Sequence, residues 1–474
     1  MNSEFSDKMS SFYTIATYFS KFFTKSFKKS LLFTIIFGIG KFFETQWVNS
    51  YFKSLYPNEN FLSFFKKNKI IANHLFAPII VIFLFAIFLI LSLNPVSLSL
   101  QINIAIGFIS FLIGALILPS YFFNDENNKD IEANEANENK ETNKSNENKE
   151  ANEANENFKN KKFSFIKFDD DDIYSLGFCL ILVGVIFFLL SVASVGGIPL
   201  IKPSLRYGLK PILTMPVFLM IPGIGLLAAS YINKFKKQLL SRSEARFRFI
   251  LLLAMSSFFL LALGYRTPII AILLMIIIIG YYGKILAIWE IIIGALIGLG
   301  IIIGVGYFRS LGELMITTNT SPFYSFQSRV DFTLHVLNLL NYISGDFGIK
   351  HGALTLSSIP GSELGPRMTI GQLIAWRSEV TVTPTLIGPM IVEFGRFGVA
   401  IGMGLLGFIL GIGYKILQKT KDSFYIALYA ILLTYTILGI ETGILDIHVI
   451  VYFLLGSLIY FANIFYFRRS ENKK

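Results

Sequence analysis

The chain has 474 residues, of which 53% are hydrophobic and only 15% are charged, and its formal net charge is +11. Soluble domains carry about 25% charged residues. The composition therefore excludes a soluble globular protein, whose core could not bury this much apolar surface, and a bilayer must act as the apolar solvent. Much of the positive charge lies in short polar segments and in the C-terminal tail, where it sets membrane topology and does not indicate nucleic-acid binding.

The first 69 residues predict an amphipathic, interfacial region. Phenylalanines alternate with lysines along residues 12–29, a pattern typical of a helix that lies on the cytoplasmic membrane surface. Residues 31–40 are apolar, but Lys41 and Glu44 end the run early. The sequence therefore leaves open whether residues 1–69 also contain one or two membrane spans.

Ten apolar runs long enough to cross a membrane follow. They cover about 70–93, 100–123, 173–195, 211–231, 248–264, 268–283, 286–307, 386–414, 424–440 and 447–467. The predicted fold class is therefore all-α, a polytopic membrane bundle of about ten transmembrane helices, or eleven to twelve if the N-terminal region adds spans. Two spans occupy 70–123, and eight form a core at 172–467 that precedes a basic tail at 468–474.

The segment between these two units, 124–171, is of low complexity. Its stretch Glu132–Lys140 (EANEANENK) recurs as Glu150–Phe158 (EANEANENF). It has no apolar face, which predicts a disordered cytoplasmic linker.

Basic residues orient the predicted spans. They cluster at 234–248, at 415–421 and after 468, and all three clusters fall on one side if the spans alternate. The positive-inside rule makes that side cytoplasmic, which places the protein in the cell membrane with a cytoplasmic C-terminus. Residues 308–385 then form a long loop on the outer face, in which we expect short helices.

The outer loops are rich in arginine. The candidate residues for binding the phosphate or sugar of a substrate are Arg206, Arg266, Arg309, Arg329, Arg367 and Arg377. A guanidinium stays charged and binds phosphate or carboxylate through two parallel hydrogen bonds, so the set predicts a cavity for an anionic, lipid-linked ligand. For any single arginine, a local ion pair or a lipid headgroup is an equally good interpretation.

Two residues on a predicted helix at 325–343 are candidates for proton transfer. Asp331 and His335 are four residues apart and share one face. The carboxylate can orient the imidazole so that the ring acts as a general base. A salt-bridged surface pair on an interfacial helix is the alternative.

Two further carboxylates lie near predicted span ends. Glu393 is a candidate catalytic residue, three positions before Arg396 in an otherwise apolar helix. Charge at such a place usually faces a polar cavity, and a structural bridge between two helices is the alternative. Glu441 lies with Asp446 and His448 in the turn before the last span, where they line the same cavity or cap helices.

No motif in the sequence calls for a metal or another cofactor. The single cysteine, Cys179, cannot form a thiolate cluster, and His335 and His351 lack the spacing of paired ligands. The sequence also lacks a phosphate-binding loop, a dinucleotide-binding motif and kinase motifs.

Several stretches resemble a known family. They are GYRTPIIAILLMIIIIGYYGK (Gly264–Lys284), WEIIIGALIGLGIIIGVGYFRSLGE (Trp289–Glu313), VTVTPTLIGPMIVEFGRFGVAIGMGLLGFILGIGYK (Val380–Lys415), GGIPLIKPSLR (Gly196–Arg206) and ETGILD (Glu441–Asp446). Over about 173–467 the chain resembles the archaeal oligosaccharide repeat-unit polymerases, also described as putative O-antigen polymerases. Bacterial relatives have a glycine eleven residues after an arginine in two outer loops. Here Arg309, Arg329 and Arg367 lead to other residues, so those roles are not carried over.

The resemblance implies a membrane glycosyltransferase that joins lipid-linked oligosaccharide repeat units into a surface polysaccharide on the outer face. The corresponding enzyme hypothesis is an inverting glycosyl transfer from a polyprenyl phosphate or diphosphate carrier, which requires no metal if the arginines neutralise the phosphates. A transporter or flippase of a lipid-linked saccharide or another anion is the main alternative, and it would need charges that continue through the bilayer. A ligase that moves a finished glycan would have the same sequence features.

The predicted topology can be tested by labelling. In a Cys179→Ala background, Ser357→Cys should react with an impermeant maleimide in intact cells, and Ser145→Cys should react only after lysis. The reverse pattern would invert the orientation and remove the argument for an outer-face site.

Overall fold

The computed structural model describes residues 74–122, 168–265, 267–314, 321–359, 361–362, 364–375 and 381–471, and its secondary structure in these ranges is helical. The predicted interfacial region at 1–69 lies outside them, as do residues 124–167 of the linker and the last three residues of the basic tail, 472–474. Seven helices of the described ranges are long and apolar enough to span a membrane, and three shorter apolar helices accompany them. These ten segments coincide with the ten predicted spans, which confirms the prediction of an all-α, multi-pass membrane bundle.

One helical unit precedes the linker, and a second follows it. The first comprises α5 (Ile80–Ile90) and a continuous helix built from α6 (Leu98–Leu112), a π-helical turn (Ile113–Ile117) and α7 (Leu118–Phe122). The second begins with α10 (Asp170–Val195), η3 (Pro203–Gly208), α11 (Pro211–Thr214), η4 (Met215–Leu219), α12 (Met220–Lys236), α13 (Arg242–Ala262), α14 (Thr267–Tyr282) and α15 (Ile288–Leu314). It continues with α16 (Pro322–Ser344), α17 (Ala353–Leu356), α18 (Pro366–Ala375), α19 (Gly388–Thr420), α20 (Ser423–Thr442) and α21 (Ile447–Glu471).

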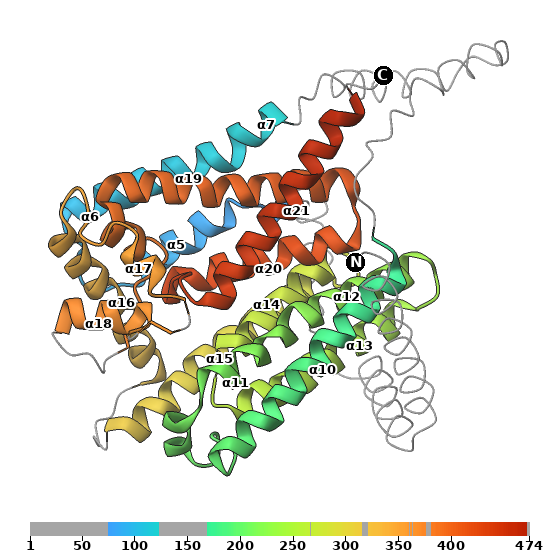
Figure 1. Ribbon diagram of the computed structural model, residues 1–474, viewed down its shortest axis with the longest axis horizontal. Coiled ribbons are helices and arrows are strands. Elements are labelled where there is room, and N and C mark those ends of the chain that lie inside the picture. Colours follow the sequence, from blue (N-terminus) through green and yellow to red (C-terminus); the bar gives the residue numbers. More distant parts are fainter. Residues whose placement is uncertain are drawn as a thin grey trace, which may run out of the picture.

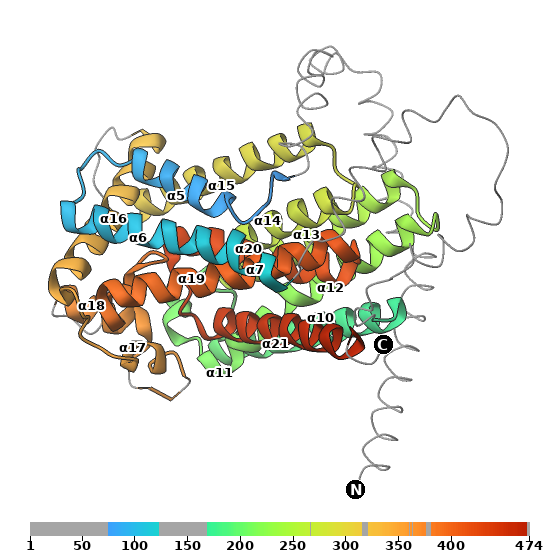
Figure 2. The same ribbon diagram turned by 90° about the horizontal axis from the view of Figure 1, so that it is seen from above.

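The long helices run side by side between two ends of the bundle (Figure 1). The short helices α17 and α18 gather with α16 at one end, which we call the loop end, and Figure 2 shows the same grouping from above. The α12–α13 and α19–α20 connections lie at the other end, where Lys236 Nζ donates to the Lys421 carbonyl at 2.5 Å. We call this the basic end, because lysines and arginines of the 234–248 segment lie there.

Helix α20 forms the centre of the bundle, and 83% of its most apolar stretch is buried. It packs against α12, α14 and α19. Close backbone approach joins the N-terminal unit to this core, because a Cβ added at Gly114 of α6–α7 would lie 2.1 Å from the Gly404 carbonyl oxygen of α19. Small residues at such crossings are typical of helix packing in membranes.

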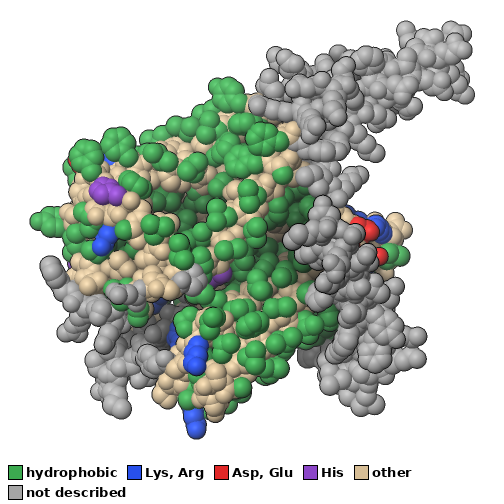
Figure 3. Space-filling view, viewed as in Figure 1, with side chains coloured by type: hydrophobic (Ala, Val, Ile, Leu, Met, Phe, Trp, Pro, Cys, Tyr) green, Lys and Arg blue, Asp and Glu red, His purple; other side chains and the backbone are tan. Residues whose placement is uncertain are grey.

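The outside of the bundle is apolar, as a lipid-facing surface must be. Large hydrophobic side chains on the outer helices are exposed, among them Ile90, Phe258 and Leu458. Figure 3 shows one face of the molecule covered mainly by hydrophobic side chains, with few charged ones.

Helix α19 differs from the prediction, which placed a single span at 386–414. Its backbone leaves helical geometry at Phe394 (φ −138°, ψ 21°) and Gly395 (φ 57°, ψ −136°). The segment Gly345–Gly352 crosses this break and replaces the lost helical hydrogen bonds. Its Ile349 N–H donates to the Val392 carbonyl at 2.8 Å and His351 N–H donates to the Glu393 carbonyl at 3.1 Å. In return, Arg396 N–H donates to the Asp346 carbonyl at 3.0 Å.

Gly395 is the residue on which this crossing depends. Its φ is positive, and an added Cβ would lie 2.1 Å from the Asp346 carbonyl oxygen. We expect Gly395→Ala to destabilise the protein by more than the 1–3 kcal/mol typical of a disfavoured backbone conformation. A lower thermal midpoint in detergent measures this effect. Gly300→Ala in α15 is the control, since nothing lies within 4 Å of its added Cβ; equal midpoints for the two variants would contradict the prediction.

Candidate functional site

The turn between α20 and α21 brings two predicted arginines together at the loop end. Arg329 of α16 pairs with Glu441 at 2.5 Å, and Arg367 of α18 pairs with Asp446 at 2.6 Å. The arginine side chains are 42% and 34% exposed, respectively. Each described contact uses one guanidinium nitrogen, and a guanidinium has five N–H donors. Both arginines therefore keep donors that a ligand can reach.

An aromatic row connects this turn to Arg206. The Arg206 guanidinium lies 5.0 Å from the centre of the Tyr265 ring. Tyr265 packs edge-on against Phe218 at 5.6 Å, and the His448 ring stacks on Phe218 at 4.7 Å between centroids. His448 follows Asp446 by two residues. The Phe218 backbone is fixed in turn, because its carbonyl accepts a hydrogen bond from the Tyr452 hydroxyl at 2.9 Å.

We call this set of residues the arginine–aromatic surface, and it comprises Arg206, Tyr265, Phe218, His448, Asp446, Arg367, Glu441 and Arg329. The sequence predicted its three arginines and Glu441 as substrate-binding residues. It did not indicate Phe218 and Tyr265, because a phenylalanine and a tyrosine at span ends fit a membrane interface equally well.

The other predicted arginines stay predictions. Arg266 and Arg377 lie outside the described residues, and Arg309 lies in α15 with a side chain that is likewise not described.

Asp331 contacts the turn between α5 and α6. Its Oδ1 accepts hydrogen bonds from Ser92 Oγ at 2.7 Å and from Leu93 N–H at 2.8 Å. Partial burial favours a raised pKa, but the hydrogen bonds from this turn outweigh it and hold the pKa of Asp331 below its usual value. In the described part of the chain no hydrogen bond joins Asp331 to His335, whose ring is exposed. The carboxylate thus orients the turn in this structure.

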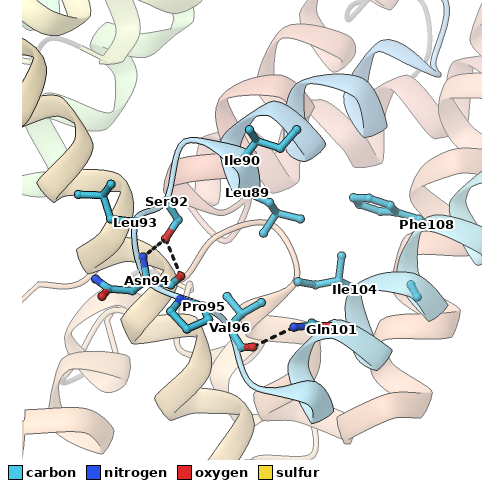
Figure 4. Close-up of a pocket in the computed structure, with 11 residues that line it drawn as sticks. Leu89, Ile90, Ser92, Leu93, Asn94, Pro95, Val96, Gln101, Ile104 and Phe108 are labelled. Atoms are coloured by element: carbon cyan, nitrogen blue, oxygen red, sulfur yellow. Dashed lines mark hydrogen bonds between the residues drawn. The ribbon is translucent and has the colours of Figure 1, made fainter.

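The α5–α6 turn separates two cavities. On one side, Asp331 and His335 line a cavity of about 400 Å³ against Ser92–Val96. On the other side, the same turn borders an apolar cavity of about 620 Å³ between α5 and α6 (Figure 4). Ser92 and Asn94 hydrogen-bond to each other within the turn, and Gln101 Nε2 donates to the Val96 carbonyl at 3.0 Å.

Glu393 is 4% exposed and binds the N-terminal turn of α17. Its carboxylate accepts hydrogen bonds from Gly352 N–H, from Thr355 N–H at 2.6 Å and from Thr355 Oγ1 at 2.9 Å. Arg396 pairs instead with Asp346 at 3.0 Å. This geometry favours a role in anchoring the loop segment 345–356 over one in proton transfer.

Nothing in the described ranges brings three His, Cys, Asp or Glu side chains close enough to hold a metal ion. The arginine–aromatic surface offers guanidinium, imidazole and carboxylate groups beside aromatic rings.

The fold and this surface define a multi-pass membrane protein with an arginine-bearing surface at one end of its bundle. The chain belongs to the family described as Putative O-antigen polymerase, whose model matches residues 74–453. An uncharacterized protein of Methanocaldococcus jannaschii is 30% identical over 288 residues, which are 60% of this chain and 76% of the relative. No solved structure matches the chain.

The anchoring role of Glu393 can be tested by proteolysis. Glu393→Ala leaves the Gly352 and Thr355 N–H groups without their partner and leaves the N-terminal turn of α17 without its anchor. We expect the variant to be cleaved faster within 345–375 and to unfold at a lower temperature. Asp346→Ala is the matched control, because it removes an exposed ion pair worth about 0.2–1 kcal/mol. Similar cleavage of the two variants would contradict the anchoring role.

Proposed function

We propose that this protein is a membrane glycosyltransferase that polymerises lipid-linked oligosaccharide repeat units into a surface polysaccharide. The observation that carries the proposal is the arginine–aromatic surface at the loop end of a member of the Putative O-antigen polymerase family. Guanidinium groups suit the phosphate or diphosphate of a polyprenyl carrier, and aromatic rings beside them suit its sugar.

The proposed reaction is an inverting displacement. A hydroxyl oxygen of one glycan attacks the anomeric carbon of another, and the bond from that carbon to the carrier phosphate breaks. The electron pair leaves with the polyprenyl phosphate or diphosphate, whose negative charge Arg206, Arg329 and Arg367 stabilise. Part of this stabilisation is preorganised, since Glu441 and Asp446 already hold two of the guanidinium groups in place.

An imidazole takes the proton of the attacking hydroxyl in this proposal. His335 is the residue predicted from the sequence, and it lies on α16 beside the 400 Å³ cavity. His448 lies in the arginine–aromatic surface itself, stacked on Phe218. His448→Gln and His335→Gln variants therefore separate the two candidates. Only the variant that replaces the general base should lower the elongation rate while the amount of protein stays normal.

The loop end faces the outside of the cell in this proposal. Basic residues at the opposite end, including Lys234, Lys236 and Lys237, favour its retention in the cytoplasm together with the C-terminus. The arginine–aromatic surface then lies at the depth of the outer lipid headgroups.

The core of the bundle favours an enzyme over a transporter or flippase. The buried residues of α12, α14 and α20 are all uncharged. A transporter of an anion would need polar groups along its path through the bilayer. The described charges of the candidate site lie instead at the loop end, where a lipid-linked substrate is reached from the membrane surface.

The phosphate role of the arginines predicts a specific pattern among conservative variants. Arg329→Lys and Arg367→Lys should keep normal protein levels and lose elongation by about a hundredfold, because a point charge does not replace a bidentate fork. The assay contains purified protein, a lipid-linked repeat unit and no nucleotide, and it measures glycan length. Arg246→Lys is the matched control, since Arg246 pairs with Glu290 at 2.9 Å at the basic end.

The carboxylate partners make this test sharper. If Arg329 and Arg367 serve only to bind Glu441 and Asp446, then Glu441→Gln and Asp446→Asn should be as harmful as the arginine variants. If the arginines bind phosphate, Glu441→Gln and Asp446→Asn should lower elongation less than the lysine variants do, because they remove only the contact that positions each guanidinium and leave the guanidinium itself in place. Normal elongation by both lysine variants would refute the phosphate role.

A further inference from the structure

A polar stripe runs along one face of α16. Its members are three or four residues apart, so they lie within about 80° of one another around the helix: Tyr324, Ser328, Asp331, His335 and Asn338. All five line the 400 Å³ cavity, opposite the α5–α6 turn. Helix α16 buries Val330, Leu337 and Leu340 on other faces, so this stripe is separate from the packing face.

Two polar side chains of the stripe are held in place by hydrogen bonds and still have a donor or acceptor for which no hydrogen bond is described. Asp331 uses its Oδ1 for the turn, and no described hydrogen bond engages its Oδ2. Asn338 accepts from Ser97 Oγ through its Oδ1 at 2.5 Å, which leaves its amide N–H groups for the cavity. The His335 ring is exposed beside them. Two fixed polar side chains and one imidazole thus face the same space.

The charge of the cavity selects the kind of ligand. Among the described residues that line it there is no lysine or arginine, and Asp331 is the single charged one apart from the titratable His335. Because the hydrogen bonds from the turn keep the pKa of Asp331 low, this side chain is a carboxylate at neutral pH and repels phosphate. Hydroxyl groups of an uncharged ligand can instead donate to Oδ2 and accept from the Asn338 amide.

The aromatic residues suit the same ligand. Tyr324 and Phe332 line the cavity and are 54% and 56% exposed. Exposed aromatic rings next to fixed polar groups offer a flat apolar face for the C–H side of a sugar ring. The cavity volume also lies within the range of roughly 300–1,000 Å³ that small-molecule sites occupy.

We propose that the polar stripe of α16 forms a saccharide-binding subsite that takes the uncharged glycan part of a lipid-linked substrate. This inference rests on the proposed function and deepens it, because it divides the substrate between two faces of one helix. Arg329 lies about 140° around α16 from the stripe, on the side of the phosphate-binding arginines. A polymerase must hold two glycan chains at once, and a subsite without cations holds one of them without competing for the phosphate.

Binding of a delipidated glycan tests the subsite directly. The probe is the oligosaccharide released by mild acid from the lipid-linked repeat units, titrated onto the full chain in nanodiscs. Ser328→Trp places a bulky ring in the cavity from an exposed position, and Tyr324→Ala removes an aromatic face. We expect each variant to weaken glycan binding about tenfold or more, with an unchanged thermal midpoint. Tyr342→Ala is the matched control, since Tyr342 is 85% exposed on α16 outside the cavity.

A second probe separates the subsite from the arginines. Ser328→Trp should bind vesicle-embedded polyprenyl diphosphate as tightly as the wild type does. Arg329→Lys should lose affinity for polyprenyl diphosphate and keep wild-type affinity for the glycan. Wild-type affinity of Ser328→Trp and Tyr324→Ala for the glycan overturns the subsite, and so does a wild-type protein that does not bind it. A wild type that binds the glycan and does not elongate it overturns the proposed function and leaves the subsite standing.

Discussion

The candidate site depends on the need to satisfy every backbone group within or near the bilayer. Helix α19 breaks at Phe394 and Gly395, which frees carbonyl and N–H groups beside the apolar core. The segment Gly345–Gly352 supplies their partners, and the Glu393 carboxylate fixes α17 directly after it. The loop end is thereby joined to the bundle by a backbone interaction that water would weaken. Helix α18 and its Arg367 follow α17 in the chain, so the position of the arginine–aromatic surface depends on this crossing.

The same logic accounts for what the sequence could predict and what it could not. Membrane spans are predictable because twenty apolar residues in a row have few alternatives. Seven of the ten predicted spans match described helices that are long enough to cross a membrane, and the other three match shorter apolar helices. The helix at 325–343 followed equally from local periodicity. The break in α19 left no comparable local signal, because its cause is a tertiary contact between Gly395 and Asp346, which are far apart in the sequence.

The site residues show the same division. Arg329, Arg367 and Glu441 were predicted from charge at the loop end, and the structure brings their pairs to one turn. The prediction that Asp331 orients His335 used helical spacing alone, and the carboxylate is bonded to the α5–α6 turn, more than two hundred positions earlier in the chain. Spacing establishes which residues share a face of a helix. It does not establish which distant element the face meets, and at Asp331 that element determines its partners.

In the proposed function, helix α16 resolves a physical conflict that arises when two charged, lipid-linked chains are joined. Phosphates require cations, and cations placed along a glycan path would hold both carriers in the same place. In this structure Arg329 lies where α16 meets the α20–α21 turn, and a cavity whose described lining has no lysine or arginine lies on another face of the same helix. A rigid helix keeps the two environments at a fixed separation, whereas flexible loops would let a guanidinium swing into either one. Under the proposed function, the separation of charge around α16 would specify which part of a substrate can occupy each face.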